Sequence, residues 1–275
     1  MTFQAVDPIM PGWAVMWGLA IAIYFLLKLL SWWHRKPIVV ALWKHLAYLL
    51  FWPGMNVDSF LNPKNLKVVS PPRMEWSLAC VNLAIGLGCL VIVVSMISKF
   101  DSYLAGWAGM IGLIFSLHLG LFHLLSLLWR GCGLQADPIM NWPIASQNLA
   151  EFWGRRWNLA FRDLTNHFLF RPLIGRLGPT GSLLTGFVVS GLIHELVISV
   201  PAHGGFGGPT TYFALQGVVL CVTHSRFGKT VGMDRGPWGR IVCAVTSLLP
   251  LPLLFHRPFV ENVIIPFLRV MRSLR

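Results

Sequence analysis

The sequence predicts an all-α fold, a polytopic transmembrane helical bundle of about seven to eight membrane helices with interfacial amphipathic helices beside them. Three observations predict this fold class. Only 12% of the 275 residues are charged and 55% are hydrophobic, a balance that is not typical of soluble proteins. Apolar runs long enough to cross a bilayer recur along the chain. Tryptophans, which prefer the depth of the lipid headgroups, lie near the ends of these runs, at Trp13, Trp32, Trp33, Trp52, Trp76, Trp129 and Trp238.

Seven apolar runs are the predicted membrane spans, and they cover roughly residues 13–30, 37–53, 77–98, 103–129, 181–200, 209–224 and 238–255. The sixth run is short, so we expect it to be tilted, re-entrant or continued beyond its apolar part. We see no soluble domain, internal repeat or low-complexity tract between the runs. The chain is therefore expected to form a single integral-membrane, multi-pass domain over residues 1–275.

The formal net charge of +12 is explained by anionic lipid headgroups and by the excess of Lys and Arg in cytosolic loops. Nucleic acid is not an expected partner. If all seven runs span, the loops around 54–76, 130–180 and 225–237 share one side and hold most of the Lys and Arg, which favours a cytosolic position for the 130–180 loop. The basic "HRK" after the first run favours the opposite orientation, and one re-entrant segment would invert the count.

The segment 130–180 is the longest part of the chain without a clear span. It opens with "RGCGLQADPIMNWP", where Gly and Pro argue against a continuous helix, and Ser146 then follows as a candidate N-cap. Apolar residues next recur at helical spacings of three and four, namely Leu149, Phe152, Trp153, Trp157, Phe161, Leu164 and Phe168. Charged residues interrupt this pattern. We expect one or two amphipathic helices at the membrane surface or lining a buried chamber.

Two ionisable residues, His194 and Glu195, lie in the middle of the apolar run "GFVVSGLIHELVIS" at 186–199. A charged side chain at the centre of a span is costly, so the pair marks a candidate functional site. The small residues Ser190 and Gly191 just before it allow another helix or a substrate to approach closely. Histidine takes up a proton near neutral pH and is therefore a candidate base. On this residue alone, a core histidine bonded to a neighbouring helix is an equally good explanation.

The string "FWGRRWN", which ends at Asn158, and the later string "SGLIHE" together resemble the membrane-bound O-acyltransferase (MBOAT) family. The resemblance covers roughly residues 141–200 and is greatest to the wax synthase branch, which contains acyl-CoA:alcohol and acyl-CoA:sterol acyltransferases. It implies a helical bundle that encloses a central reaction chamber. It also implies that His194 is the intramembrane catalytic histidine and that Asn158 lies opposite it. Acyl-CoA would enter from the cytosol, and a lipid alcohol from the bilayer.

The residue types suit the chemistry that this resemblance implies. His194 can act as the general base that removes the alcohol proton, and the Asn158 amide can orient or stabilise the thioester carbonyl. Glu195 is interpreted as structural support. Acyl-CoA is a co-substrate, and neither a cofactor nor a metal is predicted. The CoA phosphates need a basic entrance, and the residues assigned to it are Arg155, Arg156, Trp157 and Arg162, although arginines beside tryptophans also extend to lipid headgroups without binding a substrate.

Other readings stay open at this point. The chain is short for the family, so a noncatalytic integral subunit of a larger membrane complex is the main alternative, and homo-oligomer formation is also open. A transporter or haem-binding protein would use His118, His123 and His194, but the first two are five residues apart and do not share a helical face cleanly. The acceptor also stays open among fatty alcohols, sterol-like or hopanoid alcohols, and hydroxylated carotenoids or isoprenoids.

Overall fold

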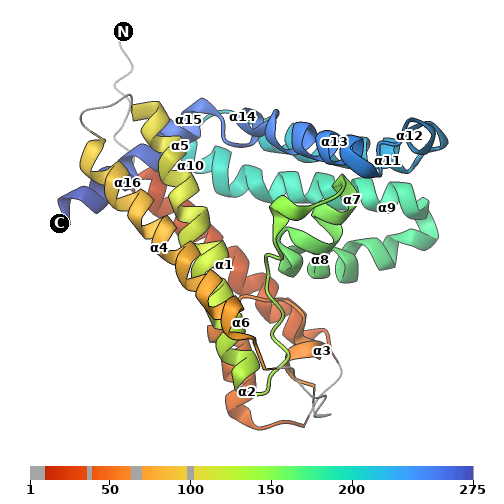
Figure 1. Ribbon diagram of the computed structural model, residues 1–275, viewed down its shortest axis with the longest axis horizontal. Helices are drawn as coiled ribbons and strands as arrows, with labels where there is room; N and C mark the ends of the chain where they lie inside the picture. The colour runs from red at the N-terminus through yellow and green to blue at the C-terminus, as the bar shows by residue number, and fades with distance from the viewer. Residues whose placement is uncertain (1–9, 36–38, 63–69, 98–101, 275) are drawn as a thin grey trace.

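The structure is a computed structural model that describes residues 10–35, 39–62, 70–97 and 102–274. The described residues form helices joined by turns and loops, and no strand occurs among them. Figure 1 shows two groups of helices that diverge from a common end of the molecule. The first group contains α1 (Gly12–Trp33), α4 (Arg73–Met96) and the continuous helix α5 (Ser102–Leu113), η2 (Ile114–Leu121) and α6 (Phe122–Gly131). The second contains α9 (Arg171–His194), α11 (Gly208–His224) and α13 (Gly236–Leu248).

The first group is packed through small residues. A Cβ atom added at Gly86 of α4 would lie 2.4 Å from the backbone nitrogen of Ser116 in η2, so the two backbones are nearly in contact there. At Gly112 the same atom would lie 2.9 Å from Leu90. Close approach at glycine and serine is the usual way in which membrane helices gain van der Waals contact. These two helices therefore form a tight pair.

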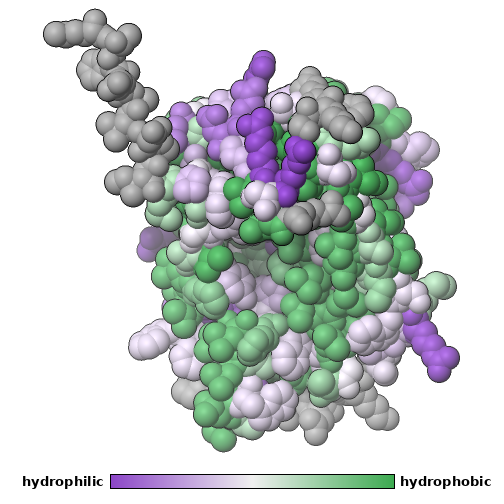
Figure 2. Space-filling view, turned by 90° about the vertical axis from the view of Figure 1, so that its left-hand side faces the viewer, coloured by the Kyte–Doolittle hydropathy of each residue, from purple (hydrophilic) through white to green (hydrophobic). Residues whose placement is uncertain are grey.

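Five helical segments of the described chain are long and apolar enough to cross a membrane, namely Gly12–Trp33, Arg73–Met96, Ser102–Gly131, Leu159–Ala202 and Gly236–Leu254. They correspond to five of the seven predicted spans. The predicted sixth run is helix α11, whose 17 residues rise about 26 Å, slightly less than the apolar thickness of a bilayer. Figure 2 shows apolar side chains over the flank of the molecule, with most strongly hydrophilic side chains at its upper rim. The chain is therefore an all-α, multi-pass integral membrane protein.

The predicted span over 37–53 differs in the structure. Only α2 (Leu42–Leu46) and η1 (Ala47–Phe51) are helical there, and ten residues rise about 15 Å, half of the bilayer core. The chain then turns back at "PG", because proline cannot continue a helix. Residues 37 and 38 lie outside the described part. The segment is therefore short and re-entrant in shape.

Helix α1 holds this re-entrant segment with polar groups. The fully buried Lys28 donates to the carbonyl of Gly54, and its ammonium lies 3.4 Å from the centre of the Tyr48 ring. The Tyr24 hydroxyl donates to the carbonyl of Trp52 over 3.0 Å. A buried ammonium is stable only with such partners, and these contacts explain why an apolar run of this length folds back instead of crossing.

The 130–180 segment is broken as predicted. It contains η3 (Pro143–Ala145), α7 (Leu149–Glu151), η4 (Phe152–Arg156), α8 (Leu159–Thr165) and η5 (Asn166–Phe170), which leads into α9. The N-cap of α7 is Asn148 and not Ser146, since the Asn148 side chain accepts a hydrogen bond from the Glu151 N–H over 2.8 Å. Helix α9 is kinked at Gly178, whose φ of 67° suits glycine. These breaks place α7 and α8 between the two helix groups (Figure 1).

Candidate functional site

His194 is the last residue of α9, where the helix widens into the π-turn η6 (Glu195–Ser199). Its Nδ1 lies 2.7 Å from the carbonyl oxygen of Ser190, one turn earlier. A carbonyl only accepts hydrogen bonds, so Nδ1 carries the hydrogen and the neutral ring keeps its lone pair on Nε2. No hydrogen bond to Nε2 occurs among the described residues. The ring is thus oriented by its own helix with its basic nitrogen available.

Two aromatic rings from other helices pack on His194. The centroid of Phe213, on α11, lies 4.4 Å from that of the imidazole, and the centroid of Phe161, on α8, lies 6.5 Å away in an edge-on arrangement. The histidine therefore faces the interior between α8, α9 and α11. Its hydrogen bond is to its own helix, so the reading of a core histidine bonded to a neighbouring helix does not describe it.

The motif "FWGRRWN" reaches the same aromatic cluster through Trp153. The Trp153 ring centroid is 5.8 Å from that of Phe213, and its Nε1–H donates to Oε1 of Gln216 over 3.2 Å. Gln216 is fully buried on α11 and in turn donates to the carbonyl of Thr246 over 2.7 Å. Phe213 thus contacts one residue of each motif, Trp153 and His194. Gln216 is a single polar residue in an apolar run, and that was the signal for its role in the sequence.

Asn158 is the N-cap of α8. Its φ of 41° and ψ of 60° are left-handed, a conformation that asparagine tolerates better than most residues. Its Oδ1 accepts the N–H of Phe161 over 3.3 Å, and the ring of the same Phe161 packs on His194. The structure therefore connects Asn158 to His194 through Phe161. No hydrogen bond joins the two residues directly within the described part of the chain.

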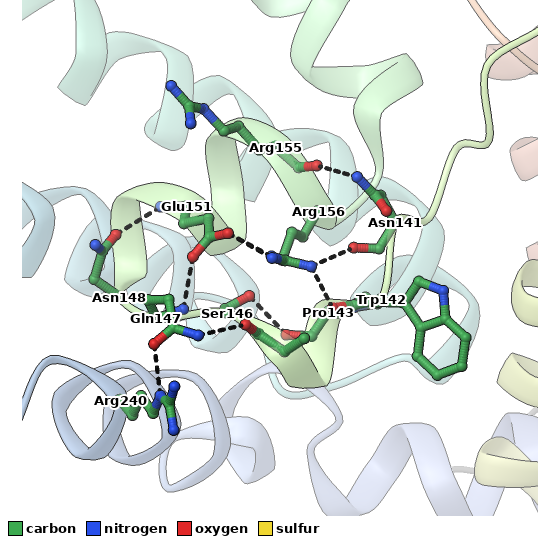
Figure 3. A network of polar contacts seen from close by, with 11 residues as sticks. Asn141, Trp142, Pro143, Ser146, Gln147, Asn148, Glu151, Arg155, Arg156 and Arg240 are labelled. Carbon is green, nitrogen blue, oxygen red and sulfur yellow. Dashed lines mark hydrogen bonds and ion pairs between the residues drawn. The ribbon is translucent and has the colours of Figure 1, made fainter. Parts of the chain in front are cut away.

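Arg156 is held by internal partners (Figure 3). Its Nε and Nη2 donate to Oε1 of Glu151 over 2.8 and 2.6 Å, and its Nη1 donates to the carbonyls of Asn141 and Trp142 over 3.3 and 3.2 Å. The N–H of Gln147, together with this guanidinium, holds the pKa of the Glu151 carboxyl below its usual range. Arg156 therefore ties the 141–142 loop to α7.

The other residues assigned to CoA have different surroundings. Arg155 is exposed, and its guanidinium points away from the network in Figure 3. Trp157 stacks on Phe152 with ring centroids 5.5 Å apart. Arg162 donates to the carbonyl of Gly154 over 2.8 Å and forms an ion pair with Asp163, which leaves its Nε buried without a partner. Of the two arginines among them, Arg155 has the guanidinium more open to a ligand.

Glu195 joins the end of α9 to the start of α11. Its Oε1 accepts hydrogen bonds from the N–H of Gly207 over 2.9 Å and from the N–H and hydroxyl of Thr210 over 3.1 and 2.9 Å. Beside it, a Cβ atom at Gly191 would lie only 2.6 Å from the Cα of Thr210. The carboxylate therefore caps the next helix where the two backbones meet, which agrees with its interpretation as structural support.

The remaining histidines of the long apolar run have separate environments. His123 lies 3.0 Å from Oε1 of Glu75, which also pairs with Arg130. His118 lies in η2, and its Nδ1 is buried without a partner. No group of three or more His, Cys, Asp or Glu side chains arranged to hold a metal occurs in the described ranges. A pocket of about 120 Å³ lies beside α8 and is lined by Arg162 among others, but not by His194.

The family model and the known proteins reported below that match this chain are all O-acyltransferases. Residues 136–215 match the family model described as the membrane bound O-acyl transferase family. The chain is 29% identical over 176 residues to a probable long-chain-alcohol O-fatty-acyltransferase 2 of Arabidopsis thaliana, covering 58% of this chain and 50% of the relative. It is 38% identical over 71 residues to an acyl-CoA–sterol O-acyltransferase 1 of the same plant, covering 23% and 21%. A long-chain-alcohol O-fatty-acyltransferase of Simmondsia chinensis is 32% identical over 99 residues, covering 33% and 28%. The matched region spans at most about half the length of these relatives.

Proposed function

We propose that this chain, whose residues 136–215 match the membrane bound O-acyl transferase family, transfers a fatty acyl group from acyl-CoA to the hydroxyl of a lipid alcohol. The observation that carries the proposal is the meeting of the two motifs at one histidine. Trp153 and Asn158 of the first motif reach His194 of the second through Phe213 and Phe161. Relatives named for fatty alcohols and for sterols support a lipid alcohol as the acceptor class.

His194 supplies the base in this mechanism. Because its Nδ1–H is bonded to the Ser190 carbonyl, the lone pair on Nε2 takes the proton of the alcohol hydroxyl. The alcohol oxygen then forms its bond to the thioester carbonyl carbon, and the C–S bond to CoA breaks. The imidazolium gives its proton to the CoA thiolate, which returns the ring to its starting state. The Ser190 carbonyl stabilises the imidazolium in between.

Asn158 supplies the polar donor. Its Oδ1 is bonded to the Phe161 N–H, so the Nδ2 amide hydrogens are the part of the side chain left for a substrate. A fixed amide donor stabilises the negative charge that develops on the thioester oxygen, because it needs no reorganisation during the reaction. The left-handed backbone at Asn158 holds this amide at the start of α8. The aromatic residues around His194 exclude water, which would otherwise hydrolyse the acyl group.

The re-entrant segment supports a proposal for the side from which CoA enters. Because 42–51 is too short to cross, the end of α6 lies beside the re-entrant segment, where Trp129 donates to the Phe51 carbonyl. The end of α1 lies beside the 132–170 segment, since the ring of His34 packs on those of His167 and Phe168. His34 and Arg35 after α1 then share a side with the arginines of the motif. The positive-inside bias therefore supports a cytosolic entrance at this end, with Arg155 as its phosphate contact.

Acyl transfer by the purified protein in nanodiscs tests the proposal. Long-chain acyl-CoA is supplied with a panel of fatty alcohols, sterols and hydroxylated isoprenoids, and ester and free CoA are measured. His194→Ala is expected to abolish ester formation. The matched control is His224→Ala, since Nδ1 of His224 also contacts the carbonyl four residues earlier, at 2.8 Å from Leu220, but at the other end of α11. This control is expected to keep the parent rate.

Two outcomes would contradict the proposal. Ester formed equally by the parent and by His194→Ala would remove the assigned base. No ester with any acceptor, in protein that is folded and binds acyl-CoA, would instead favour a noncatalytic subunit, and stable copurification with membrane partners would then be the next measurement.

A further inference from the structure

A basic hairpin connects α11 to α13 at the end of the molecule far from α16 (Figure 1). It contains the short helix α12 (Arg226–Val231) and the first turn of α13. Its exposed cations are Arg226, Lys229, Arg235 and Arg240. None of the ion pairs among the described residues involves them, and one acidic residue, Asp234, lies in the same stretch. The hairpin therefore presents uncompensated positive charge.

An apolar stripe begins directly beside this charge. Helix α13 exposes four large apolar side chains at spacings of three and four, Trp238 (48%), Ile241 (49%), Val245 (51%) and Leu248 (63%). The opposite face of the same helix, with Val242 and Cys243, is buried. An exposed apolar stripe on a membrane-spanning helix faces lipid, and a tryptophan at its end marks the headgroup level. The cations of the hairpin therefore lie at the depth of the lipid phosphates, together with the exposed ring of Phe227.

The hairpin is also bonded to the motif segment. The Asn148 side chain donates to the carbonyl of Asp234 over 2.8 Å, and Nε of Arg240 donates to Oε1 of Gln147 over 2.7 Å. Gln147 in turn donates its backbone N–H to Glu151, the partner of Arg156 (Figure 3). A chain of hydrogen bonds thus runs from the hairpin to the residues just before "FWGRRWN".

We propose that the Ser225–Arg240 hairpin binds the headgroups of anionic phospholipids, and that this binding steadies residues 147–156. Several cations at headgroup depth attract an anionic lipid, and each contributes appreciably to its binding. CoA also carries phosphates, but the lipid-facing stripe that continues from Trp238 places the hairpin against the bilayer, where headgroups are present at all times. Headgroup binding does not depend on the acyl transfer proposed above. An effect of the lipid on turnover does rest on that proposed function.

Hydrogen–deuterium exchange in nanodiscs tests this proposal without any need for turnover. The full chain is placed in discs of phosphatidylcholine alone or mixed with phosphatidylglycerol. Phosphatidylglycerol is expected to slow exchange in 225–240 by about ten- to thirtyfold, the effect of two cations near an anionic surface, and to slow exchange in 147–156 as well. The double variant Arg226→Gln/Lys229→Gln is expected to lose both effects. Arg269→Gln/Arg272→Gln, on the exposed side of α16 (Ile265–Ser273), removes the same charge elsewhere and is expected to keep them.

The exchange results distinguish a lipid site from a CoA site and test the coupling to residues 147–156. Equal exchange in both kinds of disc overturns the proposal. Protection of 225–240 by soluble CoA in phosphatidylcholine discs, without protection by phosphatidylglycerol, also overturns it and assigns the surface to CoA. Protection of the hairpin alone, with 147–156 unchanged, removes the coupling. Protection in a protein that forms no ester supports the lipid site and contradicts the proposed function, so the two failures are distinguishable.

Discussion

Replacement of Glu195 tests which of two roles this residue has. It is either the cap of helix α11 or a catalytic partner of His194, its neighbour in the sequence. The carboxylate bonds to Gly207 and Thr210 at the start of α11, and no contact with the His194 ring accompanies these bonds. Glu195→Gln keeps an acceptor oxygen at the same place and removes the charge. Glu195→Ala removes the acceptor as well. If the residue is a cap, both variants lose stability in a graded way, and Glu195→Gln keeps its catalytic rate.

The expected size follows from the hydrogen bonds. Bonds to a charged acceptor contribute about 1.5–3 kcal/mol and those to a neutral acceptor about 0.5–1.5 kcal/mol. The two bonds from Thr210 are partly buried, while the one from Gly207 is exposed and counts for less. Glu195→Gln should therefore lower the free energy of unfolding by about 2 kcal/mol, and Glu195→Ala by about 3–5 kcal/mol. In a domain of this size these losses correspond to falls in Tm of about 4–8 °C and about 6–20 °C.

Tm and the ester-forming rate are measured on the same nanodisc preparations. The rate is measured at a temperature well below the Tm of either Glu195 variant. Thr210→Val, which removes one of the three bonds, serves as the control and should lie between the parent and Glu195→Gln in Tm. The reasoning is refuted if Glu195→Gln is as inactive as His194→Ala while its Tm stays within a few degrees of the parent, because the charge would then act on the chemistry.

Three further predictions follow from other contacts. Gly191→Ala puts a Cβ atom 2.6 Å from the Cα of Thr210, so it should cost about 1–3 kcal/mol and reduce ester formation, while Gly186→Ala, which meets no atom within 4 Å, should be neutral in both assays. The lowered pKa of Glu151 means that its stabilisation of the surrounding loop is present above the ordinary pKa of about 4.3 and is lost as pH falls through the lowered value. The protection factor of that loop, which corrects for the intrinsic pH dependence of exchange, should therefore fall in acid, and Glu151→Gln should remove this fall. Lys28→Met should speed exchange in the re-entrant segment with little change elsewhere, and unchanged exchange there would contradict the anchoring role of the ammonium.

The helices that cross the membrane could be predicted from the sequence because apolar runs of that length have few other stable structures. The run 37–53 shows where hydropathy fails. Its apolar residues could fill a span, and what turns it back is a set of contacts with α1, above all those of Lys28. Hydropathy averages over residues and does not register a partner on another helix. The buried lysine in the first run and the "PG" at 53–54 were the available signals.

The sequence offered candidate residues for the site, but it could not offer their geometry. The two strings mark His194 and Asn158, and the resemblance assigns their roles. Gln216 stands out as a polar residue in an apolar run, but its partner Trp153, which is 63 residues away, could not be assigned from the sequence, and neither could Phe213. The π-turns at Phe152–Arg156 and Glu195–Ser199 lie beside both motifs. Such turns follow from tertiary packing and functional constraint more than from local residue preference.

Two histidines of this chain show what distinguishes a candidate base from a histidine that merely lies on a helix. His194 and His224 each place Nδ1 within hydrogen-bond distance of the carbonyl four residues earlier, at 2.7 and 2.8 Å, so both are held in the same tautomer. Local helix geometry therefore does not separate them. His224 is exposed at the end of α11, whereas the ring of His194 lies against Phe213 and Phe161, in the interior that both motifs reach. The tautomer of His194 is set by its own helix, α9, through the Ser190 carbonyl. The reactive environment is supplied by α11 and α8, whose Phe213 and Phe161 pack on the imidazole.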